Sequence, residues 1–255
     1  GFLRYTGGDQ VTDRGITLPS GWGYVDVTQA STELEFEGDV VGAGGLAKRG
    51  LGTLILSGTN THTTGTAVEA GTLIAGSAQA LGSGYLWIHS GATVDMTGFS
   101  NTVYALSDNN TTGGEILIGD KTLTLNGGSS TFAGRITGTT GELIKNGGTQ
   151  TLTGCSNNYG GRTVIDGGWI AAACLADGDQ ASSIGASSND ASNLVIGRAA
   201  NAGLQYIGDG DTTDRSFTLG AADGYIRNDG TGALEFTNTA PVSFVGTGAR
   251  RLRLG

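Results

Sequence analysis

The chain has 255 residues, of which 48 are glycine and only two are proline, and its formal net charge is −9. Glycine at this level excludes a helix-rich domain, because each glycine costs about 1 kcal/mol in a helix. The absence of a three-residue glycine period excludes collagen. The acidic balance argues against nucleic acid or an anionic membrane as the main partner, since both require clustered lysine and arginine.

Short runs in which apolar and polar residues alternate recur along the whole chain, and Gly, Asn, Asp or Ser bounds almost every run. This period-two alternation over three to five residues predicts half-buried β-strands. No window has the 3.6-residue period of a helix. In chain order, the sequence predicts strands at residues 53–56, 66–69, 73–75, 85–88, 93–96, 115–118, 122–125, 150–153, 163–165, 194–196 and 242–245.

An internal repeat relates the first half of the chain to the second. Residues 45–50 realign with residues 142–147 at an offset of 97, and after a one-residue deletion we continue the alignment at an offset of 96. The positions matched in this way are Leu56 and Leu152, Gly58 and Gly154, Gly65 and Gly161, Val68 and Val164, Gly71 and Gly167, and Ile74 and Ile170.

A second repeat relates the two ends of the chain. Tyr5 matches Tyr206 and Asp13-Arg14 matches Asp214-Arg215 at an offset of 201. We therefore expect one continuous segment over residues 1–255, open at both ends. It would contain repeat copies at about residues 42–100 and 138–200, with diverged segments 1–41 and 201–255 that match each other.

A long repeat made of short strands is typical of a solenoid, in which coils stack on equivalent coils. A period of 97 residues would hold about five coils of about 20 residues, and some twelve coils would form a rod of about 60 Å. Corners of such coils need a positive φ or a close approach of backbones, which glycine supplies most easily. The predicted corner glycines are Gly50, Gly58, Gly65, Gly71, Gly147, Gly154, Gly161 and Gly167.

The first repeat copy resembles the passenger-associated β-strand repeat of autotransporters. Leu46 and Lys48 open the motif, residues 50–58 read Gly-Leu-Gly-Thr-Leu-Ile-Leu-Ser-Gly, and Ala80-Leu81-Gly82 follows it. His62 stands where the family has tyrosine, and the second copy departs from the family at Gln150 and Trp169. The resemblance, which extends to the pertactin-like passengers, implies an all-β, right-handed parallel β-helix on a large bacterial cell-surface or secreted protein.

Cys155 and Cys174 are the only cysteines, and they are 19 residues apart, close to one coil. Neighbouring coils lie about 4.8 Å apart, so a disulfide could join them. Two free thiols that merely pack together are the alternative. The spacing leaves both open.

Few residues suggest chemistry. His62 and His89 are the only histidines and no Gly-x-Ser-x-Gly elbow accompanies them, so we interpret His62 as a turn or surface residue. Residues 208–214 lack the glycine and distal glutamate of a calcium loop and are interpreted as a turn. The recurring Asp13-Arg14 and Asp214-Arg215 suggest a structural ion pair or corner. We interpret the glycosylation pattern at residues 109–112 as chance, and Arg250, Arg251 and Arg253 are too few to define a binding patch.

The sequence therefore predicts a non-catalytic structural and adhesive segment with no cofactor or metal, which acts as a stalk or filament at the bacterial cell surface. The expected partner is a host, matrix or neighbouring-cell ligand, or another copy of the protein, without nucleic acid or membrane insertion. Both ends stop within a repeat, so we expect continuation into further repeats or end-to-end stacking. A carbohydrate-active β-helix, such as a polysaccharide lyase or a tailspike-like glycan binder, is the alternative. A face of ordered threonines that binds ice is disfavoured by the irregular Thr-x-Thr spacing.

Overall fold

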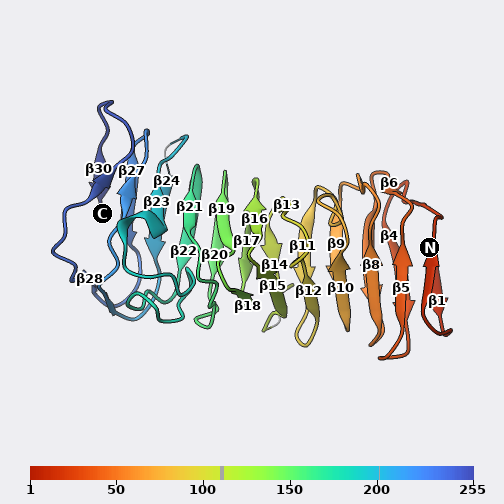
Figure 1. Cartoon of the computed structure of the whole chain (residues 1–255). Helices are drawn as coiled ribbons and strands as arrows, with labels where there is room; N and C mark the ends of the chain where they lie inside the picture. Colours follow the sequence, from red (N-terminus) through yellow and green to blue (C-terminus); the bar gives the residue numbers. More distant parts are fainter. Residues whose placement is uncertain (110–111, 201) are drawn as a thin grey trace.

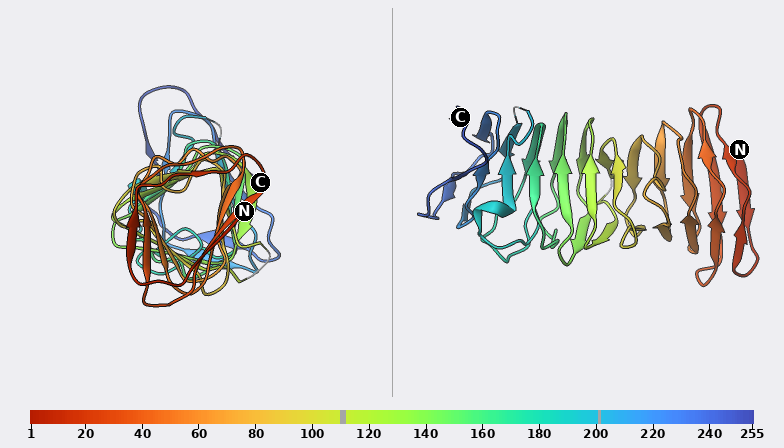
Figure 2. Two further views of the ribbon diagram at one scale, coloured as in Figure 1. Left: turned by 90° about the vertical axis from the view of Figure 1, so that its right-hand side faces the viewer. Right: turned by 45° about the horizontal axis from the view of Figure 1, so that its top comes forward.

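The computed structural model describes residues 1–109, 112–200 and 202–255. These residues form a parallel β-solenoid of about 11 turns (Figure 1). Viewed along the axis, the coils superimpose (Figure 2). Apart from one 3₁₀ turn, η1 (Ala191–Asn193), every described element is a strand, and each strand pairs in parallel with the strand of a neighbouring coil. The predicted all-β parallel β-solenoid is confirmed.

The strands form three faces, which we number in the order in which the chain visits them. Face 1 contains two six-stranded sheets that follow each other along the axis. The first sheet contains β1 (Phe2–Tyr5), β4 (Trp22–Val27), β7 (Gly45–Arg49), β9 (Gly65–Val68), β11 (Tyr85–Ile88) and β14 (Leu106–Ser107). The second contains β17 (Ser129–Phe132), β20 (Thr149–Leu152), β22 (Gly168–Ala172), β24 (Ala202–Tyr206), β27 (Gly224–Asn228) and β30 (Leu252–Leu254).

Faces 2 and 3 are each interrupted once. Face 2 contains β2 (Gln10–Thr12), β5 (Glu33–Phe36), β8 (Thr53–Leu56), β10 (Thr72–Ala75), β12 (Thr93–Asp95), β15 (Glu115–Gly119) and β18 (Arg135–Gly138), followed by β25 (Asp211–Thr213) and β28 (Leu234–Phe236). Face 3 contains β3 (Ile16–Thr17) and β6 (Val40–Val41), followed by β13 (Asn101–Val103), β16 (Thr122–Leu125), β19 (Glu142–Lys145), β21 (Thr163–Ile165), β23 (Leu194–Ile196), β26 (Thr218–Leu219) and β29 (Ser243–Phe244). Loops occupy the interrupted positions.

Period-two alternation forms these strands because every second side chain points into the solenoid. On face 2 the inward positions form one ladder of apolar residues, and each member is buried. The ladder consists of Leu34, Leu54, Leu73, Val94, Ile116 and Ile136, paired in register in that order. Stacking identical or similar side chains in this way fills the interior continuously, so each coil depends on its neighbours for its core.

The second repeat copy is turned by one face relative to the first. β7 lies on face 1 and its counterpart β19 lies on face 3; β8 lies on face 2 and its counterpart β20 lies on face 1. The face 1 strands between them show that the copies are separated by four complete turns and two further faces. The match at an offset of 201 behaves differently, because β4 and β27 both lie on face 1. One motif can therefore occupy different faces of the solenoid.

The alignment of the later part of the repeat at an offset of 96 is wrong. His62 bonds Thr66, and the same contact joins Tyr159 to Thr163, an offset of 97. The second copy is one residue shorter before β20 and regains that residue in the loop after Gly154, so only the positions around β20 stand at 96. The inward-facing partner of Leu73 is accordingly Ile170, whereas the offset of 96 would place the partly exposed Trp169 there.

Only some of the predicted corner glycines have a positive φ, and in the second copy the corrected alignment shows which glycine does. Among the predicted set, φ is positive at Gly50, Gly65 and Gly71. In the second copy, φ is positive at Gly168 instead of the predicted Gly167, with values of +66° at Gly71 and +73° at Gly168. This left-handed conformation strains any residue with a Cβ atom, which explains why glycine occupies the turn in both copies.

Candidate binding face

The outer surface of face 1 carries the tryptophans and a row of tyrosines. All three tryptophans lie on its strands, with Trp22 on β4, Trp87 on β11 and Trp169 on β22. Tyr24 and Tyr85 lie on the same strands as the first two. The outward positions of β8, β10 and β12 on face 2 are instead threonine, isoleucine and aspartate. The tryptophans are therefore confined to one face.

Small residues underlie the first tryptophan pair. The cross-strand register places Gly45 and Gly65 between Trp22 and Tyr85. A Cβ atom at Gly45 would lie 2.7 Å from the Trp22 ring, and one at Gly65 would lie 2.8 Å from the Trp87 ring. These distances are shorter than a van der Waals contact, so only glycine lets both indoles lie down over the sheet.

The two indoles meet over these glycines. Their ring centroids are 5.3 Å apart with an interplanar angle of 71°, the edge-to-face arrangement that aromatic pairs prefer. Tyr85 lies 5.3 Å from Trp87 and 5.2 Å from Tyr104, which extends the row towards the next coil. Phe2 extends it in the other direction, at 6.5 Å from Tyr24. The row therefore runs along the solenoid axis.

A cleft of about 310 Å³ opens within this row. It is lined by Trp22, Tyr24, Ala67, Glu69, Trp87, His89 and Asn109, and we call it the Trp22–Trp87 cleft. Aromatic walls with a few polar groups at the rim are the usual composition of a small-molecule binding site. This cleft could not be predicted from the sequence, because its residues come from separate coils and only the cross-strand register of face 1 brings them together.

The charges at the rim of the cleft cancel. Arg49 donates from Nε to Oε2 of Glu69 at 2.7 Å and from Nη2 to Oε1 at 3.2 Å. The guanidinium also lies 4.0 Å above the ring of Tyr24. The hydrogen bond to the Glu69 carboxylate raises the pKa of Arg49. The two side chains form an ion pair, whose charges cancel. The cleft thus presents rings and hydrogen-bonding groups without net charge.

The aromatic–glycine arrangement recurs near the other end of face 1. Gly203 lies in register between Trp169 and Tyr225, whose ring centroids are 5.7 Å apart. The guanidinium of Arg227 lies 5.3 Å from the Trp169 ring, and that of Arg253 lies 5.6 Å from the Tyr225 ring. Arg253, one of the three arginines of the predicted minor basic cluster, therefore belongs to this aromatic group.

A long loop, residues 173–190, takes the place of a strand on face 2, next to the shorter loop of residues 153–162. Arg215 holds it: the side chain is 3% exposed and donates only to groups of this loop. The acceptors are the carbonyl oxygens of Ala176, Asp177, Gln180, Gly185 and Ser187, together with Oγ of Ser187. Arg215 is thus a structural hub, whereas Arg14, its predicted counterpart, is exposed. The two Asp-Arg pairs nevertheless form the same corner, since the amides of Arg14 and Arg215 donate to Oγ1 of Thr12 and of Thr213.

Cys155 lies near the start of the shorter loop and Cys174 near the start of the longer one. The structure joins Cys155 to Cys174 in a disulfide, with the Cα atoms 5.5 Å apart. The bridge links the shorter loop to the longer one across neighbouring coils. Counting the thiols of the native protein distinguishes this disulfide from two free thiols.

The other candidate site residues predicted from the sequence mostly have roles in holding the fold. His62 is completely buried, so its interpretation as a turn or surface residue is wrong; it occupies the inward tyrosine position of the motif, as Tyr159 does. Residues 211–213 of the calcium-like segment form the strand β25, so the interpretation of this part as a turn is wrong. Asp211 accepts a hydrogen bond from the Leu175 amide and Asp214 accepts one from the Gly178 amide, so the segment helps to hold the long loop. The glycosylation pattern includes residues 110 and 111, which lie outside the described residues.

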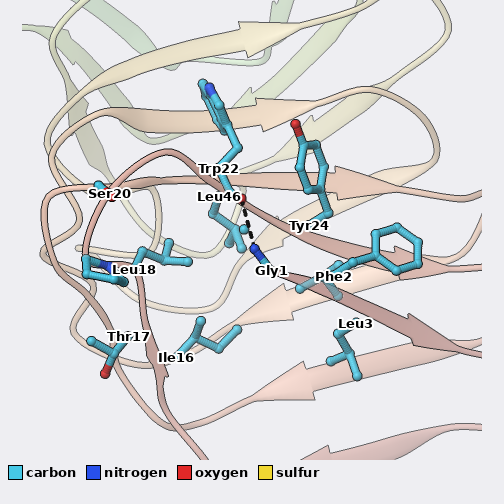
Figure 3. A pocket seen from close by; sticks show the side chains of 13 residues that line it. Gly1, Phe2, Leu3, Ile16, Thr17, Leu18, Ser20, Trp22, Tyr24 and Leu46 are labelled. Carbon is cyan, nitrogen blue, oxygen red and sulfur yellow. Dashed lines mark hydrogen bonds between the residues drawn. The ribbon is translucent and has the colours of Figure 1, made fainter.

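The ends of the described solenoid leave core residues uncovered. A cavity of about 330 Å³ lies at the first coil, where Ile16, Leu18 and Leu46 line it (Figure 3). Trp22 and Tyr24 also contribute to its edge, and in Figure 3 both point away from Ile16 and Leu18. This cavity continues the hydrophobic interior and differs in kind from the Trp22–Trp87 cleft.

Among the described residues, no group of three or more His, Cys, Asp and Glu side chains could hold a metal ion. No helix within the described part of the chain has the length and apolar character that crossing a membrane requires.

Comparisons with known proteins agree with the architecture. Residues 46–75 and 143–172 match the passenger-associated-transport-repeat family, and the offset of 97 at both ends of the match agrees with the structural equivalence. The chain is 50% identical over 250 residues, 96% of its length, to the Adhesin BmaC autotransporter of Brucella suis biovar 1 (strain 1330), and it spans 7% of that protein. No solved structure matches it. The chain is therefore a β-solenoid with two matches to the passenger-associated-transport-repeat family, and it is similar to a segment of an autotransporter adhesin.

Proposed function

We propose that this chain is a non-catalytic adhesive segment of an autotransporter passenger, displayed at the bacterial cell surface or released from it. The observation that carries the proposal is the aromatic row on face 1. Solvent-facing aromatic rings anchored over glycines supply contact area at low entropic cost, because they are already ordered before a partner binds. The relative named an adhesin supports the same interpretation.

The carbohydrate-active alternative is less well supported. Glycoside hydrolysis ordinarily requires two carboxyl groups that flank the scissile bond. Glu69 is the one carboxylate among the residues that line the Trp22–Trp87 cleft, and Arg49 holds it as an ion pair. The cleft is therefore suited to binding a ligand without cleaving it.

An adhesion assay tests the proposal. Beads coated with the chain are offered to host epithelial cells, to extracellular-matrix proteins and to one another, with beads coated with the heat-denatured chain as the control. We expect the folded chain to increase attachment to at least one of these surfaces. Equal attachment of folded and denatured chain on all three would overturn the adhesive function. Release of new reducing ends or unsaturated sugars from polysaccharides would overturn its non-catalytic character.

A further inference from the structure

We propose that the Trp22–Trp87 cleft is a binding site for an uncharged carbohydrate chain that lies along the solenoid axis. This inference rests on the proposed adhesive function and names the chemical class of its ligand. The walls of the cleft, its rim and the exclusion of other polymers support this inference.

The walls of the cleft suit the apolar faces of sugar rings. Trp22 and Trp87 are held by contact with each other and by the glycines beneath them, so binding a ligand does not require their ordering. Ala67, which lies in register beside Trp87, is 7% exposed and adds a small apolar side chain to the lining. A sugar ring that stacks over these indoles buries its apolar face, the side that carries no hydroxyl groups.

The rim of the cleft suits the hydroxyl groups. Each oxygen of Glu69 accepts one hydrogen bond from Arg49 and retains a lone pair, and the side chain is 29% exposed. His89 and Asn109 add further hydrogen-bonding groups to the lining. Because the Arg49–Glu69 pair cancels its own charge, an ionic ligand gains little there. Neutral hydroxyl groups, which both donate and accept, fit this rim.

The arrangement disfavours the other polymers. A peptide that adds as a strand requires a free sheet edge. Strands β7, β9 and β11 are instead paired with a neighbour on both sides. Nucleic acid is disfavoured because its phosphates require clustered positive charge, whereas the chain has a net charge of −9. The aromatic row continues beyond the cleft to Phe2 and to Tyr104, which is 44% exposed. An extended polymer along the axis can contact the whole row.

Titration with neutral oligosaccharides tests the inference. The reporter is the Trp169→Phe variant of the full chain, in which Trp22 and Trp87 are the remaining tryptophans, and the probes are oligosaccharides of glucose, galactose or N-acetylhexosamine with sialylated counterparts. We expect quenching or a spectral shift of the tryptophan fluorescence with at least one neutral probe and no preference for the sialylated form. No binding to any probe below about 1 mM, or a preference for charged probes, would overturn the inference.

Variants in the same background locate the site. Trp87→Ala should weaken binding at least about tenfold, as expected for an anchoring aromatic residue, and Glu69→Gln should weaken it less. Ile55→Ala, on the outer side of face 2, is the matched control and should leave binding unchanged. Trp87→Phe, which keeps a ring, should retain part of the binding and guards against misfolding of the alanine variant. Equal binding by Trp87→Ala and the control would overturn the site.

The bead assay separates the two proposals. If Trp87→Ala beads attach to cells as well as unmodified beads and no probe binds, the carbohydrate site is wrong while the adhesive function stands. If oligosaccharide binds in solution but folded beads attach to nothing, the site stands and the adhesive function is wrong.

Discussion

Buried polar side chains tie the coils together in the same way in both repeat copies. Asn60 accepts a hydrogen bond from the Val40 amide of the preceding coil and donates to the Ala80 carbonyl of the next. Asn157 makes the equivalent contacts with Ile136 and Ser183. Each asparagine therefore spans three coils, and its loss would leave buried backbone groups without partners.

A second contact of this kind involves the ring of the motif. Nε2 of His62 lies 2.8 Å from Oγ1 of Thr66, whose hydroxyl donates to the Leu81 carbonyl. Tyr159 reaches Thr163 in the second copy, and Thr163 donates to Ile184. Because the threonine proton is already used, neutral His62 donates through Nε2. Burial then lowers its pKa below the ordinary value, since protonation would place a charge in the core.

We predict that His62 makes the fold sensitive to mild acid. Because burial lowers the pKa of His62 in the folded chain, the unfolded chain binds a proton there more readily once the pH falls below about 6.5. The free energy of unfolding therefore decreases as the pH is lowered, by at most about 1.4 kcal/mol per pH unit. In His62→Gln this loss between pH 7 and pH 5 should shrink, whereas His89→Gln, the partly exposed control, should retain it. Urea unfolding at three pH values measures the effect. An unchanged pH dependence in His62→Gln would contradict it.

Two buried lysines also form hydrogen bonds with backbone carbonyl groups. Lys48 is fully buried and Nζ donates to the carbonyl oxygens of Arg49, Gly50 and Ala70 at 2.8 to 3.0 Å. Lys145, also fully buried, donates to the carbonyls of Gly127 and Gly147. Burial lowers the pKa of both amines to about 8, so both remain largely charged at neutral pH.

Replacement of Lys48 by methionine should destabilise the chain by about 3 kcal/mol, because three carbonyl groups at a corner lose their donor. Lys145→Met should cost less, since two carbonyls are affected. Lys121→Met, at a surface lysine paired with Asp120, is the control and should change stability by less than about 0.5 kcal/mol. Chemical denaturation ranks the three variants. An order in which the control is as destabilised as Lys48→Met would refute the role of the buried amine.

At the scale of elements, the two face 2 loops are the main departure from regular coils. Residues 153–162 and 173–190 lie beside each other, joined by the Asn157–Ser182 bridge and by the cysteine pair. The guanidinium of Arg215 then fixes the longer loop from the following coil. The position of β25 therefore depends on a loop that is itself held by side chains instead of by a sheet.

We predict that Cys155 and Cys174 are oxidised in the native protein. Thiol reagent added to the denatured, unreduced chain should react with no cysteine, and after reduction it should react with both. The single-serine variants provide the calibration, since each must expose one thiol. Two reactive thiols before reduction would establish the free-thiol alternative and leave Arg215 as the main restraint on the loop.

Much of the element-level structure could be predicted from the sequence, because a strand reports its burial within its own residues. The predicted strand at residues 53–56 coincides with β8, and that at 122–125 coincides with β16. The register between copies could not be predicted fully, because the insertion in the loop after Gly154 that compensates for the deletion before β20 is hidden by coincidental matches such as Gly71 with Gly167. The Trp22–Trp87 cleft was missed for a different reason, since it depends on which residues of distant coils share a cross-strand position.

On the scale of the whole molecule, face 1 is discontinuous between its two sheets. β14 and β17 lie in successive coils but belong to different sheets. The side chain of Gln150 bridges this discontinuity from the interior. Oε1 accepts from the Leu106 amide at 2.9 Å, and Nε2 donates to the carbonyls of Leu106 and Ser130 at 3.1 and 3.2 Å. A leucine, Leu54, occupies the corresponding position of the first copy.

Gln150→Leu should therefore weaken the connection between the two parts of the rod. We expect a loss of about 1 to 3 kcal/mol, because the buried amide of Leu106 loses its acceptor, whereas the Leu106 carbonyl keeps the Ser130 hydroxyl as a donor. We also expect the unfolding transition to broaden or divide, since stacked coils are coupled mainly through neighbours. Thr151→Val, on the outer side of the same strand, is the control. Calorimetry that shows one unchanged transition in Gln150→Leu would contradict this role.

The rotation between repeat copies has a consequence for valency. In copies 97 residues apart, equivalent outer side chains lie on different faces of the solenoid. The equivalent side chains of two successive copies therefore cannot both contact one flat cell surface. Segments related by the offset of 201 keep their direction, as Tyr24 and Tyr225 on face 1 show. In a longer array, repetition of the shorter unit would spread contact points around the rod and suit it to bridging several partners. Repetition of the longer unit would align them and raise avidity for a single surface.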